Sequence, residues 1–407
     1  MLIGMAHPSF VTLGGAEILA ARHARYLHEA GHTVRFVTTA FEESRWRDLA
    51  AIAEVCVHGK RWSDHLGIPG RHPKLRRRAV RQAASLRGVD VVLAENFPAN
   101  IVAAEVRGVR RSVWYCNEPS RRLYPLATNP TLAARVNVST PASDTPLLAF
   151  ARDQFARHAE ALAGTGQLRV ERALDIAATA RLDRVIGNSC FVSEIIRQVY
   201  GRAVDAVVYP TVPNLEPPVR RTGRLDGGGL RVLTHSRLEP MKNVALVLLA
   251  FHAFASRHAG AHELHVVGEG SDEAKLRTLA QALRLDSAIH FHGFLQQDAL
   301  ESIYARCEVM ALVPVDEPFG MVFPEAAQRG LLLVGPDHGG PLEILEGGAL
   351  GWTVDIFSPD PLAEAFAEAW QLPASEVDRR RERAARACRS RYSPQATLPS
   401  LLEQLVD

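Results

Sequence analysis

The start of the chain alternates between short apolar runs and longer amphipathic segments. Residues 1–6, MLIGMA, predict a buried strand, and residues 14–31, GGAEILAARHARYLHEAG, place apolar side chains at helical spacing with Gly31 as the terminator. HTVRFVTT at 32–39 predicts the next strand. A strand, a glycine turn, a helix and a strand form the repeating unit of a parallel sheet.

The alternation continues to residue 212, with one interruption. Further strands are predicted at 90–95, 111–116, 183–189 and 204–212. Residues 127–182 break the pattern, because they are rich in alanine and helical in character, with proline and threonine breaks. They are expected to form either a lid or acceptor wall, or a helical hairpin packed on the sheet edge.

Residues 214–229 separate two halves of similar architecture. The stretch NLEPPVRRTGRLDGGG is rich in proline, glycine and charge and lacks periodicity, which is typical of a linker. After it the alternation of strands and helices restarts and runs to the last predicted strand, LLLVGP. We therefore expect an α/β fold of two doubly wound domains, residues 1–212 and 230–392, joined by a linker at 213–229. Residues 393–407 are expected to form a final amphipathic helix that crosses back to the first domain.

Composition and length limit which classes of protein and which partners are expected. The 407 residues are 47% hydrophobic and 23% charged, and the length exceeds that of one ordinary core. A net charge of +2 predicts no nucleic-acid partner. The longest apolar run, VALVLLAF, is shorter than a membrane span, and MLIGMAHPS lacks the pattern of a signal peptide. Five scattered cysteines predict reduced, buried thiols and a cytoplasmic protein.

The stretch EPFGMVFPE, at 317–325, carries the main chemical signal. It follows a predicted strand and leads into a helix, so it lies at the carboxyl edge of a doubly wound sheet, where ligands bind. The backbone N–H groups of Gly320, Met321 and Val322 are then available to a phosphate, and Glu325 to vicinal hydroxyls. Glu317 lies on the loop before them. The alternative is that an early glutamate only favours the helix dipole.

Cations and further glycine turns occur at equivalent loops. HSRLEPMKN, at 235–243, places Arg237 and Lys242 after the first strand of the second domain, where two cations can neutralise a diphosphate. Only four of the 47 basic residues are lysines, which makes Lys242 informative. Gly14–Gly15, GEGSDE at 268–273 and GGPLE at 339–343 open further strand-to-helix turns. A solvated loop is the alternative reading of each turn.

Together these segments resemble the retaining GT-B glycosyltransferases of glycosyltransferase family 4, the glycosyl transferases group 1. Glu317-Pro-Phe-Gly with Glu325 looks like the Glu-x7-Glu motif of that family, and SRLEPMKN resembles its Ser-Arg-Leu…Lys-Asn loop. GGPLEI, GNSCFVSEII, VVYPTV and GGAE are similar to further family segments. The resemblance covers nearly the whole chain and is densest over residues 183–345.

The resemblance implies an activity and a set of roles. It implies two Rossmann-like domains facing across a cleft, the first for the acceptor and the second for the donor. The reaction implied is the retaining transfer of a hexose-type sugar from a UDP- or GDP-sugar to a hydroxyl of a sugar, lipid-linked or small-molecule acceptor. No cofactor and no metal are expected, because the chain has no Asp-x-Asp motif. Glu325 would bind the ribose and Glu317 the hydroxyls of the transferred sugar. The implied catalytic positions are Glu317 and Asn117, and the implied donor-binding residues are Gly15, Arg237, Lys242, Gly268, Glu269, Leu295, Phe319, Gly320, Met321, Val322 and Glu325.

One position departs from the family pattern. YCNEPSRRLY, at 115–124, resembles a family stretch that reads Tyr-Cys-His-x-Pro, where the histidine lines the sugar site. Asn117 stands in its place, and an asparagine cannot carry a proton. Glu118 or Arg121 are the residues expected to compensate. A different sugar or acceptor preference, or impaired activity, would follow from Asn117.

Other function classes stay open at this level. A non-catalytic protein that binds a sugar nucleotide is compatible with Asn117. A GT-B epimerase or phosphorylase is a further alternative, although the paired glutamates argue against the epimerase and no lysine motif for a pyridoxal cofactor is evident.

Closure of the domains is expected through hinges at 213–229 and near the C-terminus, since Gly14–Gly15 would otherwise not reach the diphosphate.

The segment 60–87 is strongly basic. It carries nine Lys or Arg residues and one Asp, and it could dock on anionic lipid at the inner membrane face. The alternative is a solvated basic helix in an arginine-rich protein.

Overall fold

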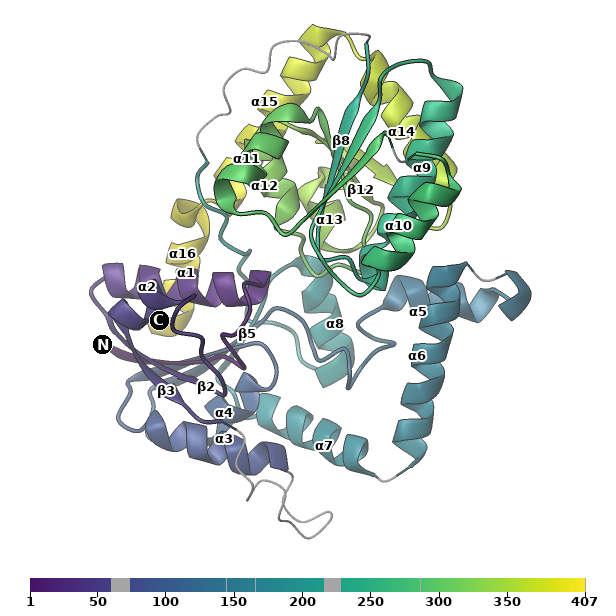
Figure 1. The fold of residues 1–407 in the computed structure, drawn as a ribbon. Coiled ribbons are helices and arrows are strands. Elements are labelled where there is room, and N and C mark those ends of the chain that lie inside the picture. Colours follow the sequence, from purple (N-terminus) through teal and green to yellow (C-terminus); the bar gives the residue numbers. More distant parts are fainter. Residues whose placement is uncertain (60–73, 144, 165, 216–227, 286, 407) are drawn as a thin grey trace. The chain divides into compact units, whose positions relative to one another are not determined.

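Residue contacts in the computed structural model divide the chain into two compact units (Figure 1). Unit 1 comprises Met1–Thr128, Asp153–Thr211 and Pro394–Asp407, and unit 2 comprises Asn129–Arg152 and Val212–Ser393. The structure describes residues 1–59, 74–143, 145–164, 166–215, 228–285 and 287–406. Most of the expected linker and the first half of the basic segment 60–87 lie outside these ranges. The division differs from the predicted one at residues 129–152, which group with unit 2.

Unit 1 is built on a parallel sheet of seven strands in the order β3-β2-β1-β4-β5-β6-β7. The strands are β1 (Leu2–Ala6), β2 (Thr33–Thr38), β3 (Ala53–Val57), β4 (Val91–Glu95), β5 (Arg111–Cys116), β6 (Arg184–Gly187) and β7 (Ala206–Val207). The order reverses between β1 and β4, and ligands of such sheets bind beside the carboxyl ends of the strands at this point.

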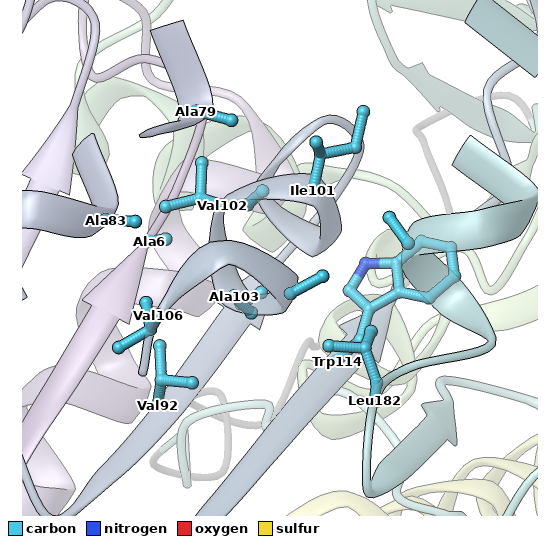
Figure 2. Close-up of a cluster of buried hydrophobic side chains, with 14 of the residues drawn as sticks. Ala6, Ala79, Ala83, Val92, Ile101, Val102, Ala103, Val106, Trp114 and Leu182 are labelled. Carbon is cyan, nitrogen blue, oxygen red and sulfur yellow. The ribbon is translucent and has the colours of Figure 1, made fainter. Parts of the chain in front are cut away.

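Helices cover both faces of the first sheet. They are α1 (Gly15–Glu29), α2 (Arg47–Ile52), α3 (Lys74–Ser85), α4 (Ala99–Glu105), α7 (Gln167–Thr179), α8 (Cys190–Tyr200) and α16 (Pro394–Val406). Trp114 and Tyr115 are neighbours on β5 and point to opposite faces, because side chains alternate along a strand. Trp114 joins the core beneath α3 and α4 (Figure 2), and Tyr115 joins the core beneath α1, α2 and α16.

The final helix is a structural part of unit 1. Leu401 and Leu405 of α16 are 0% and 1% exposed and belong to the same core as Tyr115. Burying a leucine stabilises a fold by roughly 1.5–3 kcal/mol. The C-terminal segment is therefore held by the core that also holds the first strand.

Unit 2 repeats the architecture with a six-stranded parallel sheet in the order β10-β9-β8-β11-β12-β13. Its strands are β8 (Arg231–His235), β9 (Glu263–Val267), β10 (Ile289–Gly293), β11 (Val309–Ala311), β12 (Leu332–Pro336) and β13 (Trp352–Val354). In each sheet the strand that comes first in sequence is central. The next two strands in sequence lie on one side of it, and the remaining strands lie on the other side. Two doubly wound, Rossmann-like α/β domains were predicted, and this prediction is confirmed.

The helices of unit 2 include two that precede its sheet in sequence. Those around the sheet are α9 (Val244–Arg257), α10 (Glu273–Ala282), α11 (Gln297–Arg306), α12 (Val322–Gln328), α13 (Gly339–Ile344), α14 (Pro359–Gln371) and α15 (Ala374–Tyr392). Short 3-10 turns occur at Pro141–Ser143, Pro240–Lys242 and Glu346–Gly348. Helix α5 (Pro130–Val138) belongs to unit 2, and α6 (Pro146–Ala163) begins there and ends in unit 1. The helical character expected over 127–182 is thus confirmed by α5, α6 and α7.

The expectation that the cysteines are buried is confirmed for three of the five. Cys116, Cys307 and Cys388 are buried thiols as expected, but Cys56 is half-buried and Cys190 is exposed. Cys190 begins α8, and its exposure follows from that terminal position.

Among the described helices, none combines the length and the apolar character that crossing a membrane requires.

Candidate active site

A lysine and a glutamate meet at the switch point of the second sheet. Lys242 follows β8 and Glu317 follows β11, and these two strands are neighbours at the place where the strand order reverses. Lys242 Nζ donates to Glu317 Oε2 at 2.6 Å. The side chains are 20% and 18% exposed, so water screens this charge-assisted hydrogen bond only in part. Two loops that the sequence singled out separately are therefore joined by a side-chain contact.

Glycines allow the loops of this edge to pack backbone against backbone. A Cβ atom at Gly268 would lie 1.8 Å from the carbonyl oxygen of Ser236, and one at Gly340 would lie 2.4 Å from that of Pro318. Gly340 N–H donates to the Glu317 carbonyl at 2.8 Å. The glycine turns after β9 and β12 are thus needed for close packing, and they hold the loops that carry Lys242 and Glu317.

Glu325 lies in the first turn of α12, beside a buried cation. Arg329 Nη1 donates to the Glu325 carbonyl oxygen at 3.1 Å, and its guanidinium lies 4.4 Å from the Tyr304 ring centroid. The Arg329 side chain is 7% exposed and binds Glu301 through Nε at 2.8 Å. The Tyr304 hydroxyl contacts His235 Nδ1 at 3.0 Å. Burial, with the Arg329 charge, lowers the pKa of His235 to about 4, so this histidine is neutral near pH 7.

Asp316 anchors the loop immediately before Glu317. Its carboxylate is fully buried and accepts hydrogen bonds from the N–H groups of Thr131 and Leu132, at 3.2 and 3.1 Å, at the start of α5. The Asp316 backbone has a φ of +45°, a left-handed conformation that is uncommon outside glycine. Sequence reasoning missed this residue. The only signal for Asp316 in the sequence was that it is an acidic residue immediately before Glu317, at the end of an apolar strand.

Several other predicted donor-binding residues lie at the same edge in different settings. Arg237 is 71% exposed, and its Nη1 donates to Glu239 at 2.7 Å. Glu269 Oε1 accepts from the Phe294 N–H at 3.2 Å, which joins the loops after β9 and β10, and Leu295 lies on the second of these loops. Phe319 is 3% exposed and packs edge-on against Tyr392, so its side chain belongs to the core of unit 2.

The seven-residue helix α12 begins close to where the motif predicted a helix. It spans Val322–Gln328, with Met321 as the residue before it. Gly320 has a φ of +94°, and a Cβ atom there would lie 2.9 Å from the Phe323 ring. The backbone of Gly320, Met321 and Val322 therefore takes its path around a buried aromatic side chain.

Unit 1 has its own polar row at the carboxyl edge of the first sheet. His7, Asn96, Asn117 and Asn188 each directly follow a strand, and those strands (β1, β4, β5 and β6) are consecutive in the sheet. Asn117 Nδ2 donates to Asn96 Oδ1 at 2.7 Å, and Asn96 Nδ2 lies 3.2 Å from His7 Nε2. Gly15 begins α1 after the loop that follows β1. The row places Asn117 among uncharged hydrogen-bonding groups.

The two residues expected to compensate for Asn117 bind each other. Arg121 Nε lies 2.7 and 2.8 Å from the two carboxylate oxygens of Glu118. Their side chains are 33% and 18% exposed. The opposite charges largely cancel, so this pair adds little net charge beside Asn117.

No group of three or more His, Cys, Asp or Glu side chains that could hold a metal occurs within the described ranges. That turnover needs no metal stays a prediction.

Comparison with known proteins identifies the architecture. The chain superposes on HepE of Anabaena in complex with UDP and glucose with a TM-score of 0.71, covering 99% of this chain and 98% of that chain at 18% identity. WaaG, a glycosyltransferase involved in lipopolysaccharide biosynthesis, gives a TM-score of 0.66 and 99% coverage of both chains at 15% identity. The fold is GT-B. The predicted GT-B fold is thus confirmed.

Sequence comparison concerns mainly the second unit of this GT-B protein. Residues 218–388, which include Lys242 and Glu317, match the family model described as "Glycosyl transferases group 1". Mannosylfructose-phosphate synthase of Agrobacterium fabrum is 30% identical over 141 residues, 33% of this chain and 31% of that protein. A GDP-mannose-dependent phosphatidylinositol monomannoside mannosyltransferase of Mycobacterium tuberculosis is 30% identical over 172 residues, 40% of this chain and 44% of that protein. The chain therefore spans less than half the length of these curated relatives.

Proposed function

We propose that this GT-B protein is a retaining glycosyltransferase that moves a hexose from a nucleotide-sugar donor to an acceptor hydroxyl. The observation that carries the proposal is the Lys242–Glu317 pair, 2.6 Å apart at the switch point of the second sheet. A cation and a carboxylate side by side suit a ligand that has an anionic diphosphate next to a polyhydroxylated sugar. The group 1 match of residues 218–388 supports the same assignment.

Each predicted residue has a separate task in this proposal. Lys242 would neutralise the diphosphate as it leaves, with Arg237 and the backbone at Gly320 assisting. Glu317 would accept hydrogen bonds from the hydroxyls of the transferred sugar, and Glu325 from the ribose hydroxyls. Because Lys242 and Glu317 already bind each other, both groups are oriented before the donor arrives.

The proposed reaction needs no protein nucleophile. The bond from the anomeric carbon to the diphosphate oxygen breaks through an oxocarbenium-like transition state, and its electron pair leaves with the diphosphate. The acceptor oxygen bonds to the anomeric carbon on the same face, and its proton passes to the departing phosphate oxygen. We propose that this proceeds without a metal, because Lys242 and Arg237 supply positive charge at the diphosphate.

A donor panel tests the proposal. Purified full-length protein is incubated with UDP-glucose, GDP-mannose and other UDP- and GDP-sugars together with sugar, lipid-linked and small-molecule acceptors. We expect one donor to give a glycoside whose anomeric configuration, measured by NMR, equals that of the donor. We also expect EDTA to leave the rate unchanged. An inverted product would refute retention, and activity lost in EDTA and restored by Mg²⁺ or Mn²⁺ would refute metal independence.

A second function is favoured by one observation. Asn117 stands where the resembling family has a histidine, and an amide cannot carry a proton. A protein that binds the donor without transferring the sugar would be the result. Binding of a nucleoside diphosphate by calorimetry, with no glycoside formed from any donor of the panel, would select this second function.

We further propose a cytoplasmic protein that contacts anionic lipid through α3. The exposed face of α3 carries Lys74 and Arg76 next to Val80, which is 47% exposed. Basic residues beside an exposed apolar side chain favour the surface of an anionic membrane. Co-sedimentation with phosphatidylserine vesicles, but not with phosphatidylcholine vesicles, is the expected result. Equal recovery with both would refute the contact.

A further inference from the structure

The polar row of unit 1 is one continuous hydrogen-bond chain. From Ser189 it passes through three asparagines to His7 and ends on the Ser9 carbonyl. Ser189 Oγ donates to Asn188 Oδ1 at 3.2 Å, and Asn188 Nδ2 approaches Asn117 Oδ1 at 3.5 Å, the longest link. Asn117 Nδ2 to Asn96 Oδ1 is 2.7 Å, and Asn96 Nδ2 to His7 Nε2 is 3.2 Å. His7 Nδ1 lies 3.0 Å from the Ser9 carbonyl oxygen.

The contacts at the His7 end give the chain a direction. A carbonyl oxygen only accepts hydrogen bonds, so the 3.0 Å contact with Ser9 requires a proton on His7 Nδ1. The Ser9 N–H can also donate to Nδ1, at 3.4 Å, which would need an unprotonated Nδ1, but the 3.0 Å contact with the carbonyl oxygen is the shorter of the two and favours the proton on Nδ1. With Nδ1 protonated in a neutral ring, Nε2 is an acceptor and Asn96 must turn its NH2 group toward it. Each asparagine then donates toward His7 and accepts from the Ser189 side.

The surroundings keep this arrangement in place. His7 and Asn188 are 2% and 3% exposed, so neither turns freely toward water. Burial lowers the pKa of His7, against the opposing charges of Glu95 and Glu17. Asn96 has a φ of +64°, a left-handed backbone that fixes where its side chain starts.

We propose that the tautomer of His7 sets the orientation of the Asn117 amide, and that His7 and Asn96 are positioning residues for Asn117. If the proton moved from Nδ1 to Nε2, Asn96 would have to turn its oxygen toward His7, and Asn117 and Asn188 would have to turn as well. The second N–H and the second lone pair of Asn117 would then exchange places. The tautomer thereby decides on which side Asn117 donates a hydrogen bond to a ligand hydroxyl and on which side it accepts one. This inference rests on the proposed function in placing Asn117 beside the transferred sugar.

The first test observes His7 directly. In the full-length protein labelled with 15N, two-bond proton–nitrogen spectra report which ring nitrogen of each histidine is protonated. The signals of His7 are identified among those of the 16 histidines by their loss in His7→Gln. We expect neutral His7 with the proton on Nδ1 at pH 7. A proton on Nε2 would overturn the direction inferred for the chain, and with it the inferred orientation of the Asn117 amide, whether or not the protein transfers sugar.

The second test changes the link between His7 and Asn117. Asn96→Gly deletes the side chain and suits a left-handed backbone, so the fold should persist. We expect kcat to fall about ten-fold, the effect of losing one hydrogen bond of ordinary strength. The Kd for the nucleoside diphosphate should stay unchanged, because Lys242 and Glu317 belong to unit 2.

Asn96→Asp serves as the matched variant. A carboxylate can accept from Asn117 and from a protonated His7 at once, so the Asn117 amide keeps its orientation. We expect kcat within about two-fold of the unsubstituted protein, together with a His7 that is protonated on both nitrogens. A wild-type kcat in Asn96→Gly, or an equal loss in both variants, would overturn the positioning role. If no donor is turned over by any form, the proposed transferase function fails, and a His7 in Asn96→Asp that is not protonated on both nitrogens would still overturn this inference.

Discussion

At the scale of single residues, the two motif glutamates should have different kinetic effects. Glu317 pairs with Lys242 on the loop where the proposed sugar lies, so Glu317→Gln should chiefly lower kcat. Loss of a charge-assisted hydrogen bond costs about 1.5–3 kcal/mol, or about 10- to 100-fold in rate. Steady-state kinetics with the active donor measures this. A full kcat in Glu317→Gln would remove Glu317 from the reaction.

Glu325 should act on binding instead. It lies on α12, behind the loop, where the resemblance places the ribose. Glu325→Gln should weaken donor binding by about 10- to 100-fold, with a smaller effect on kcat. Glu364→Gln, which changes an exposed glutamate of α14, is the control and should bind normally. Isothermal calorimetry with the nucleoside diphosphate distinguishes the two, and equal affinities would contradict the assignment.

Two buried histidines should make unit 2 sensitive to acid. The pKa of both His235 and His265 is lowered from 6.5 to about 4, mainly by burial. Arg329 contributes to the shift at His235, and His290 and His292 contribute at His265, where Glu263 opposes it. An unfolded histidine takes up a proton as the pH falls through 6.5, whereas these two stay neutral when folded. The stability they support is therefore complete above pH 6.5 and is lost as the pH falls toward 4.

Thermal melting from pH 7.5 to 4 checks this expectation. His265→Gln should flatten the dependence of Tm on pH, since one of the two groups no longer titrates. His28→Gln changes an exposed histidine and should leave the dependence as it is. An unchanged slope in His265→Gln would show that other groups dominate the acid response.

At the scale of elements, the attachment of α5 to the Glu317 loop should depend on Asp316. Asp316→Ala removes two hydrogen bonds to the start of α5 and should lower the unfolding free energy by roughly 1.5–3 kcal/mol. Asp298→Ala changes an exposed acid in the first turn of α11 and is the control. Denaturant unfolding measures the loss. Hydrogen exchange at residues 130–138 should accelerate only in Asp316→Ala, and unchanged exchange there would contradict the anchoring role.

Loop packing at the second-sheet edge should not tolerate one added methyl group. Gly340 needs no positive φ, so Gly340→Ala tests the 2.4 Å approach to the Pro318 carbonyl without a change in backbone preference. We expect a loss of about 1–3 kcal/mol and reduced donor binding, because the Glu317 loop must move. Gly59→Ala is the matched control, since its added Cβ would lie 3.8 Å from the nearest atom. Equal stability of the two variants would refute the steric argument.

At the scale of the whole molecule, each unit should respond to the donor in its own way. Unit 2 holds the proposed diphosphate site, so saturating nucleoside diphosphate should protect its loops after β8 and β11 from hydrogen exchange. A ligand at 100 times its Kd stabilises the state that binds it by about 2.7 kcal/mol. If the domains close as the family resemblance implies, Gly14–Gly15 of unit 1 should become protected as well, and the radius of gyration in solution should fall. Protection confined to unit 2 with an unchanged radius would refute closure.

The number of places at which the chain passes between the units differs from the number of hinges expected. It passes between the units next to residues 128, 152, 211 and 393, which is twice as many passages as the two hinges expected from sequence. The extra pair arises because 129–152 group with unit 2, where Asp316 binds α5. Periodicity identified helices over 127–182 but carries no information on which sheet a helix packs against.

The sequence by itself determined the local structure and the residue types of the sites. Strand and helix periods, glycine turns and the linker composition predicted two doubly wound domains, because these signals depend only on neighbours along the chain. The loops with Arg237, Lys242, Glu317 and Glu325 were identified for the same reason.

The contacts between those loops were decided only by the tertiary structure. Lys242 meets Glu317 because β8 and β11 are adjacent, and Asn117 joins His7 because β1, β4, β5 and β6 are consecutive in their sheet. Such pairings depend on strand order and on side-chain geometry across many residues of sequence. The same dependence explains why the Phe319 side chain packs on Tyr392, a contact that the motif could not predict.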